Sequence, residues 1–389
     1  MKKKRTLLFV HQSSELYGSD KTLFYLAKSV NENINFNVIV VIPDEGPLKR
    51  LLEENHIEVI ISSVVKVSRE MFSFWNIVSL PFNIVSSIIK LNKNLKGRKI
   101  DIIHSNTLAV LVGGFYSKVY GIRHIWHIHE IIERPKLVKV IYPIIVNFFS
   151  DYVVYNSQAS KRFFSKGNKS LEKKSITILN GLDREKSASS DEEIKNIRSS
   201  LFKVEEDDIV IGLVGRINKW KGHSLLLGSF GELVGKYKNI KLVFVGSVAP
   251  KQEILIKNLK AIIEEKDLNK KCKIIPFQND IWKIWDSIDI AVVPSIEPEP
   301  FGLVAVEAML AEKPVIASSH GGVKEIVVHN KTGFLFEPNN SGELCIFLEK
   351  MITDKNKIAE FGINGKNRAE EKFSLNSYSK KFIELYSNI

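Results

Sequence analysis

Two glutamates stand eight residues apart in the stretch EPEPFGLVAVEAM, which covers residues 297–309. The stretch follows an apolar strand, and its later part has the apolar spacing of a buried helix that begins near Phe301. A helix start offers unpaired backbone N–H groups and a positive dipole end, which suit a phosphate, and Gly302 lacks the Cβ that would hold a phosphate away. Glu307 can accept two hydrogen bonds from a vicinal diol such as a ribose, and Glu299 can reach other hydroxyls. The stretch therefore predicts a phosphate site beside hydroxyl-binding carboxylates.

Two basic residues that could balance this charge lie upstream in GLVGRINKWKG. Carboxylates beside a diphosphate would repel it unless cations stand between them. Arg216 suits a bidentate hold on phosphate oxygens, and Lys221 supplies a mobile point charge. Together they could neutralise a pyrophosphate and stabilise it as a leaving group.

Short apolar strands alternate with helical patterns in the second half and must position these residues. The strands are predicted at DIVIGLVGR, NIKLVFVGS, KCKIIPF, DIAVVPS, KPVIASS and TGFLFEP. In the first half the same alternation predicts strands at TLLFV, FNVIVVI, DIIHS, RHIWHIH, DYVVYNS and SITIL. Repeated βα units indicate parallel sheets covered by helices on both faces. A charged, Ser-rich segment over residues 183–208 separates the halves, so we predict domains at 1–182 and 183–365.

The predicted fold class is thus α/β, with two doubly wound, Rossmann-like domains facing a central cleft. The length of 389 residues fits two cores, and 44% hydrophobic residues is typical of globular proteins. Two cysteines can form neither a disulfide framework nor a metal-binding Cys cluster. Only the five-residue stretch TLLFV separates the basic start from His11, which is too short for a secretion signal, so a cytoplasmic location is expected.

The net positive charge of the chain comes entirely from the first half. Residues 1–182 carry 26 Lys and Arg against 14 Asp and Glu, whereas residues 183–389 carry 30 of each kind. Such asymmetry favours an anionic partner for the first domain, although solubility charge is the alternative. Apolar stretches at 71–91 and 137–149 are expected to be buried helices, and the first is also compatible with the membrane interface. Neither is predicted to span a membrane.

The motifs together resemble the retaining nucleotide-sugar glycosyltransferases of GT-B fold, specifically glycosyltransferase family 4. The resemblance covers nearly the whole chain. It includes the E-x7-E pair from Glu299 to Glu307, the upstream R-x4-K and the glycines at 321–322. In the first half it includes Gly18 in ELYGSDKTL, HIHE at 127–130, and ILNGLD. E-x7-E alone is a weak pattern, and its order among the other motifs makes it specific.

The resemblance implies roles for residues of the second half. Arg216 and Lys221 would hold the donor diphosphate, Gly302 and Leu303 would add backbone N–H contacts, and Glu307 would hold the ribose. Any one of these residues, taken singly, could be an ordinary surface or turn residue.

The resemblance also implies roles near the transferred sugar. Glu299 would contact the donor sugar, and the loop at Gly18 would approach the donor. His129 would lie beside the transferred sugar and the acceptor hydroxyl, although His127 competes for that register and either could be a core histidine. Residues 366–389 would form a helix crossing back to the first domain.

Family chemistry implies retention of anomeric configuration without a bound metal or other cofactor. The donor would be a nucleoside diphosphate sugar, with uridine expected, and the departing diphosphate would take the acceptor proton. The expected acceptor is a glycan or lipid-linked molecule of bacterial cell-surface polysaccharide or glycoconjugate synthesis, and the protein would touch the inner membrane face peripherally. Alternatives are a nucleotide-sugar epimerase of the same fold and a non-catalytic sugar-nucleotide binding protein. Nucleic acid is not expected, because no array of aromatic and basic residues is present.

Overall fold

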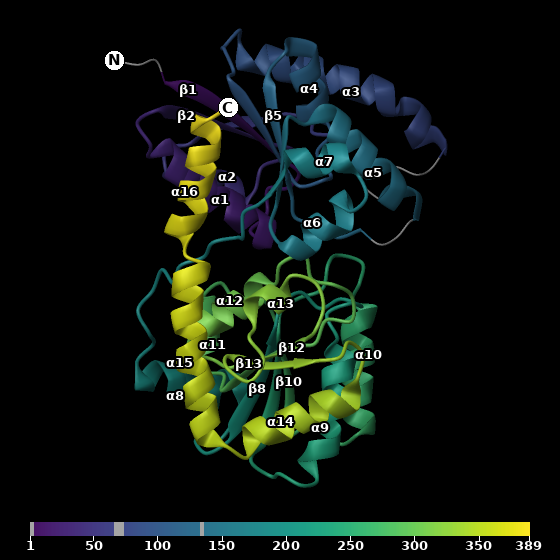
Figure 1. Ribbon diagram of the computed structural model, residues 1–389. Coiled ribbons are helices and arrows are strands. Elements are labelled where there is room, and N and C mark those ends of the chain that lie inside the picture. The colour runs from purple at the N-terminus through teal and green to yellow at the C-terminus, as the bar shows by residue number, and fades with distance from the viewer. Residues whose placement is uncertain (1–3, 66–73, 133–135) are drawn as a thin grey trace. The chain divides into compact units, whose positions relative to one another are not determined.

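The chain folds into two compact units in the computed structural model, which describes residues 4–65, 74–132 and 136–389 (Figure 1). The first unit comprises Met1–Gly181 and Leu375–Ile389, and the second comprises Leu182–Ser374. Each unit has a sheet and hydrophobic core of its own.

The first unit is built on a parallel sheet, in which the described residues form seven strands in the order β3-β2-β1-β4-β5-β6-β7. The strands are β1 (Arg5–His11), β2 (Phe36–Ile42), β3 (Glu58–Ile61), β4 (Ile102–Asn106), β5 (Arg123–Ile128), β6 (Tyr152–Tyr155) and β7 (Ser175–Thr177). Strand β3 was not predicted, because this edge strand has only four residues and buries only Ile60 among them.

Helices cover both faces of this sheet. They are α1 (Gly18–Asn31), α2 (Pro47–Glu54), α3 (Phe74–Leu95), α4 (Val112–Tyr120), α5 (Lys136–Phe149), α6 (Gln158–Ser165), α7 (Lys169–Lys174) and α16 (Leu375–Ser387). Successive side chains of β1 enter cores on opposite faces: Leu7 and Phe9 pack in the core that contains residues of α1, α2 and α16, and Leu8 and Val10 in the core with α3 and α4. This alternation fixes which side chains at the strand ends share a face.

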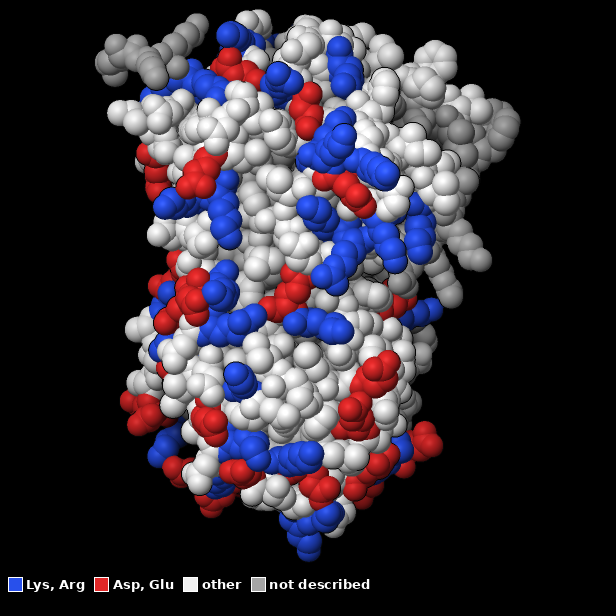
Figure 2. Space-filling model, viewed as in Figure 1, with Lys and Arg blue, Asp and Glu red and all other residues white. Residues whose placement is uncertain are grey.

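The two apolar stretches of the first half form α3 and α5, but neither helix is fully buried as expected, because Phe82 is 77% exposed and Phe148 is 65% exposed. Residues 71–73 of the first stretch lie outside the described residues, and the rest of it is helical through Pro81. Within the described ranges, no helix has both the length and the apolar character needed to cross a bilayer. Figure 2 shows Lys and Arg side chains gathered on the first unit over the part that Figure 1 labels α6 and α7.

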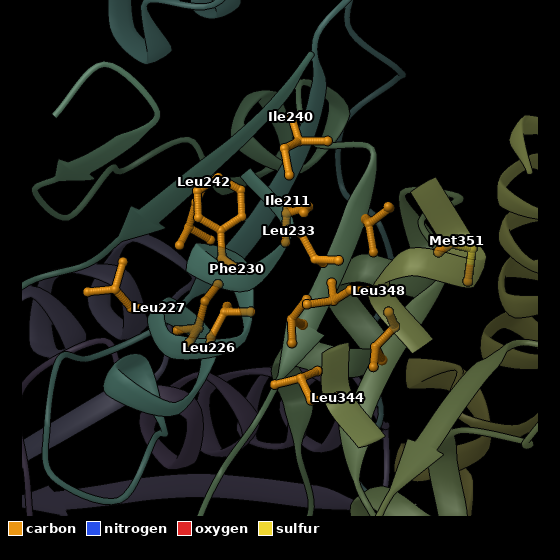
Figure 3. Close-up of a cluster of buried hydrophobic side chains, with 14 of the residues drawn as sticks. Ile211, Leu226, Leu227, Phe230, Leu233, Ile240, Leu242, Leu344, Leu348 and Met351 are labelled. Atoms are coloured by element: carbon orange, nitrogen blue, oxygen red, sulfur yellow. The ribbon is translucent and has the colours of Figure 1, made fainter. Parts of the chain in front are cut away.

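The second unit is built on a parallel sheet whose described strands run in the order β10-β9-β8-β11-β12-β13. The strands are β8 (Ile209–Val214), β9 (Ile240–Val245), β10 (Cys272–Ile275), β11 (Ile290–Val293), β12 (Val315–Ser318) and β13 (Gly333–Phe336). The helices are α8 (Asp191–Asn196), the π-helix η2 (Ile197–Phe202), α9 (His223–Val234), α10 (Ile254–Glu265), α11 (Ile281–Asp286), α12 (Leu303–Leu310), α13 (Val323–Ile326), α14 (Ser341–Ile352) and α15 (Lys355–Lys372). Aliphatic and aromatic side chains from β8, β9, α9 and α14 meet in its core, where Leu226, Phe230 and Leu348 are fully buried (Figure 3).

The C-terminal segment, expected to be one helix from about residue 366, is two helices in the structure. Helix α15 ends at Lys372 in the second unit, and α16 begins at Leu375 in the first. The break lies at Phe373, whose side chain is buried and whose carbonyl accepts the Leu182 N–H at 2.8 Å instead of continuing the helix. Helix α16 is fixed to the first sheet, since Tyr386 Oη lies 2.7 Å from His104 Nδ1.

The strand order of each sheet reverses next to its first strand. In the first unit the reversal lies between β1 and β4, and in the second between β8 and β11. At such a reversal the helices on either side of the point lie on opposite faces, and the loops at the strand ends part. The loops after these four strands are therefore where a ligand site is expected.

Candidate active site

A buried ion pair joins two of the predicted residues at the reversal point of the second unit. Lys221 Nζ, in the loop after β8, lies 2.5 Å from Glu299 Oε1, in the loop after β11. The side chains are 15% and 6% exposed, respectively. The Ser295 hydroxyl donates to the same carboxylate oxygen at 2.5 Å. Glu299 is therefore held in one orientation by a cation and a hydroxyl.

Hydrogen bonds between the loops fix this geometry. Asn218 Oδ1 accepts the backbone N–H groups of Trp220 at 3.1 Å and Lys221 at 2.9 Å, which closes a turn. The Ile296 N–H donates to the Trp220 carbonyl at 2.7 Å and ties the loop after β11 to the loop after β8. At Gly321, with φ of +62°, a Cβ would lie 2.2 Å from the Glu299 carbonyl oxygen, so the glycine permits the close approach.

Helix α12 places the other predicted carboxylate. Gly302 caps the helix, with φ of +105°, and a Cβ there would lie 2.5 Å from Val323 Cγ2. The glycine is thus required by backbone conformation and by packing on α13, in addition to the predicted approach of a phosphate. Leu303 opens the helix, and Glu307 follows within it, 7% exposed, with the Trp285 indole N–H 3.4 Å from its Oε2. The helix start and a fixed carboxylate therefore lie on the same short element.

The remaining predicted residues of the two units lie after β8 and β1. Arg216 is partly exposed in the loop after β8. Gly18 is exposed and is the first residue of α1, in the loop after β1. In the described part of the chain, no three His, Cys, Asp or Glu side chains gather as candidate metal ligands.

The histidine register left open by the sequence is clear in the first unit. His127 is fully buried within β5, and neither ring nitrogen has a hydrogen-bond partner among the described residues. His129 follows the end of β5, is partly exposed, and its Nε2 lies 2.9 Å from Asn106 Oδ1 at the end of β4. Burial lowers the pKa of His129 to about 3, so its ring is neutral at physiological pH.

Glu130 completes this corner of the first unit. Its Oε2 accepts the backbone N–H groups of Leu108 and His129, each at 3.0 Å. Burial raises the pKa of Glu130 to about 7, and the N–H donors oppose that shift. The carboxyl thus links the turn after β4 to the turn after β5.

Several residues of these sites were not predicted. Ser295, His11, Asp20 and Asn106 emerge only from the structure, where His11 Nε2 lies 2.6 Å from Asp20 Oδ1 and Asn106 Nδ2 lies 3.0 Å from His11 Nδ1. Their position relative to the predicted strands could have indicated them. Ser295, His11 and Asn106 are polar residues at or just beyond the ends of apolar strands.

The two halves of the chain each match the model of a glycosyltransferase family. Residues 18–186 match Glycosyltransferase Family 4, and residues 194–368 match Glycosyl transferases group 1. The capsular polysaccharide biosynthesis glycosyltransferase CapM of Staphylococcus aureus is 27% identical over 358 residues, which cover 87% of each chain. The lipopolysaccharide 1,2-N-acetylglucosaminetransferase of Salmonella typhimurium is 34% identical over 200 residues, which cover 50% of this chain and 51% of the relative.

Solved structures of a cyanobacterial protein have the same fold. Anabaena Alr3699/HepE in complex with UDP and glucose is 26% identical, with a TM-score of 0.84, over 98% of this chain and 99% of the other. The same protein in complex with UDP-glucose also gives a TM-score of 0.84. Two parallel Rossmann-like sheets, motif residues at their reversal points and the matched family models lead to one conclusion. The chain belongs to the GT-B glycosyltransferases.

Proposed function

We propose that this glycosyltransferase moves a sugar from a nucleoside diphosphate sugar, with retention of anomeric configuration, to a glycan or lipid-linked acceptor in bacterial cell-surface polysaccharide or glycoconjugate synthesis. The observation that carries the proposal is the Lys221–Glu299 ion pair at the reversal point of the second sheet. Glu299 lies just before the short helix α12, which contains Glu307. The UDP and UDP-glucose complexes of HepE support a uridine nucleotide donor.

Lys221 can serve the diphosphate without leaving Glu299. An ammonium group has three N–H donors, so the bond to Glu299 Oε1 leaves donors for phosphate oxygens. Arg216, in the same loop, adds a second cation, and the start of α12 adds backbone N–H groups. These charges would stabilise the diphosphate as negative charge develops on it, which is the stabilisation that a departing leaving group needs.

The carboxylates would position the sugars. Glu307 is held by the Trp285 indole and would accept hydrogen bonds from the ribose diol. Glu299 has one oxygen shared by Lys221 and Ser295, and its second oxygen would accept a hydroxyl of the transferred sugar. In the first unit, His129 would contact the transferred sugar near the acceptor, and the departing diphosphate would take the acceptor proton without an enzyme nucleophile or a metal.

A donor screen tests the proposal. Purified protein is incubated with a panel of UDP-, GDP- and ADP-linked sugars and candidate acceptors, and released nucleotide is measured together with the product anomer by NMR. We expect release from UDP-linked donors and a product with the donor's anomeric configuration. Inverted product would refute retention, an epimerised nucleotide sugar would favour the epimerase, and binding without release from any donor would favour the binding protein.

We also propose peripheral contact between the first unit and an anionic membrane on its cytoplasmic face. Helix α3 exposes apolar side chains at helical spacing, among them Phe82, 77% exposed, and Ile89, 62% exposed. Helix α5 exposes Ile144, 61%, and Phe148, 65%. Both helices contact α4 and lie on the same face of the sheet. The exposed apolar residues that form these two stripes are Val78, Phe82, Val85 and Ile89 on α3, and Val140, Ile141, Ile144 and Phe148 on α5.

Charge complementarity supports a lipid surface as the occupant. Lys90, Lys93 and Lys118 are near the stripes, and Lys118 Nζ lies 5.5 Å from the Phe148 ring centroid. Apolar stripes flanked by lysines match the interfacial region of an anionic bilayer. Co-sedimentation with vesicles of phosphatidylglycerol and phosphatidylcholine should weaken with salt and in Phe82→Ser/Phe148→Ser. Equal binding to neutral vesicles, or unchanged binding of the double variant, would contradict the contact.

A further inference from the structure

Four polar side chains form an unbroken chain of hydrogen bonds at the reversal point of the first sheet. Asp20 Oδ1 lies 2.6 Å from His11 Nε2, His11 Nδ1 lies 3.0 Å from Asn106 Nδ2, and Asn106 Oδ1 lies 2.9 Å from His129 Nε2. Asp20, His11 and Asn106 are each at most 1% exposed. The register of the sheet places them together, because His11 pairs with Asn106 across β1 and β4, and Asn106 pairs with His127 across β4 and β5.

The chemistry of the groups gives this chain one direction. An ionised carboxylate only accepts, so His11 Nε2 carries the proton that Asp20 receives. His11 Nδ1 has two contacts, the Asn106 Nδ2 at 3.0 Å and the Asn106 backbone carbonyl oxygen at 3.3 Å. The shorter contact assigns Nδ1 as the acceptor of an Asn106 N–H, because a proton on Nδ1 would point at that donor. The Asn106 oxygen is left facing His129, so His129 Nε2 must carry its ring proton. In a neutral ring, His129 Nδ1 is consequently the acceptor.

We propose that Asp20, His11 and Asn106 are positioning residues that hold His129 in the Nε2–H tautomer, so that Nδ1 is the atom that accepts a hydrogen bond from a sugar hydroxyl. The inference rests on the proposed function, which places His129 at the transferred sugar. Within the described part of the chain, His129 Nδ1 makes no hydrogen bond. A ring with a fixed tautomer and an available acceptor can orient a hydroxyl without reorganisation.

The same carboxylate also holds the start of α1. Asp20 Oδ2 accepts the Tyr17 N–H at 2.8 Å, one residue before Gly18, whose loop is proposed to approach the donor. Asp20 thus fixes the glycine loop through one oxygen and, through His11 and Asn106, the ring of His129 through the other. The structure assigns one buried aspartate to both features.

A strained turn supports a functional reading of this corner. Thr107, between Asn106 and Leu108, has φ of +89°, a conformation rare for a β-branched residue. The strain is maintained by the Thr107 N–H donating to the His127 carbonyl and by the Trp126 indole donating to the Thr107 carbonyl, each at 2.8 Å. These bonds fix the backbone directly after Asn106 beside β5.

Imidazole NMR of the full chain labelled with ¹⁵N-histidine tests the proposal without requiring activity. Two-bond ¹H–¹⁵N correlations distinguish the two ring tautomers. The His129 signal is assigned as the one that is missing from the spectrum of His129→Gln. We expect Nε2–H for His129 in the wild type. Asn106→Leu should bring in the Nδ1–H form, whereas Asn106→Asp, which retains an acceptor oxygen, should keep Nε2–H. Ser105→Ala is the matched control, because it removes the partner of His124 Nε2 on the other face of the sheet and should leave the His129 signal unchanged.

Kinetics provide the second readout. Asn106→Leu should lower kcat by about tenfold to a hundredfold with little change in the donor KM, and Asn106→Asp should recover much of the loss. An Nδ1–H signal for wild-type His129, or an unchanged His129 signal in Asn106→Leu, would overturn the proposal even in an active enzyme. If Asn106→Leu does not fold, the tautomer of His129 in the wild type and in Asp20→Asn tests the proposal instead. Absence of transfer from every donor, with the expected tautomer present, would instead refute the proposed function alone.

Discussion

Replacing Lys221 by alanine should abolish most of the transfer activity. Lys221 is 15% exposed, so an effective dielectric constant of about 20 is appropriate for its interactions. At that dielectric constant, the attraction between the Lys221 ammonium group and a phosphate charge about 4 Å away contributes about 4 kcal/mol. Removing the ammonium group deletes that attraction for the diphosphate and leaves the Glu299 carboxylate repelling it. We therefore expect kcat/KM to fall by about a thousandfold or more.

The same replacement should also destabilise the second unit. Glu299 is 6% exposed and would keep only the Ser295 hydroxyl among the two partners described above. Removing one partner of a buried ion pair costs about 3 kcal/mol, at the lower end of the usual range because Lys221 retains some exposure. In Lys221→Ala/Glu299→Gln the unpaired charge is gone, so stability should recover while activity remains lost.

Nucleotide release from the preferred donor, measured at several donor concentrations, checks the activity, and thermal unfolding checks the stability. Lys219→Ala is the matched control, since Lys219 is an exposed lysine in the same loop. A kcat/KM for Lys221→Ala within tenfold of the wild-type value would refute the assignment. So would a recovery of activity together with stability in the double variant, because the pair would then be purely structural.

Three further predictions follow from the same contacts. Glu307→Ala should weaken UDP binding by about tenfold or more, and 2′-deoxy-UDP should bind the wild type more weakly than UDP but bind Glu307→Ala equally well, as calorimetry can show; a preserved preference in the variant would remove Glu307 from the ribose. Transfer should continue at full rate in excess EDTA, and activity restored only by added Mg²⁺ or Mn²⁺ would contradict the proposed metal-free leaving-group stabilisation. Burial lowers the pKa of four histidines of the first unit below 6.5: His104, His124, His127 and His129. Below about pH 6.5 the unfolded chain therefore binds protons that the folded unit does not bind, and the free energy of unfolding should fall from pH 6.5 toward pH 4. Glu130, whose pKa is raised to about 7, binds a proton in the folded unit and offsets one of the four histidines. The free energy of unfolding should fall by at most about 4 kcal/mol per pH unit, and thermal unfolding at pH 7 and pH 5 measures the fall. A first unit that is equally stable at the two pH values would show that these rings are protonated in the folded state.

The alternating strands and helices were predictable because most strands are buried and therefore apolar over their whole length. The apolar run FNVIVVI predicts β2 without any knowledge of the tertiary structure. Strand β3 exposes half of its four residues, so it has no apolar run from which it could be predicted. The break at Phe373 was not predictable either, since it depends on a bond to Leu182, which lies far away in the sequence.

The site was predictable where a motif is local and hidden where it depends on strand order. Glu299 and Lys221 could be selected because each stands in a loop directly after a predicted strand, yet their 2.5 Å contact requires β8 and β11 to be neighbours. Asn106 illustrates the limit, because it becomes a partner of both His11 and His129 only when β4 lies between β1 and β5. No local pattern contains that order.

Calorimetric titration with UDP tests most directly whether the strand ends of the second unit hold the donor nucleotide. Saturable binding is predicted for the wild type and for Lys219→Ala, and binding at least a hundredfold weaker is predicted for the folded Lys221→Ala/Glu307→Ala variant. Equal affinity in that double variant and the wild type would contradict the central claim.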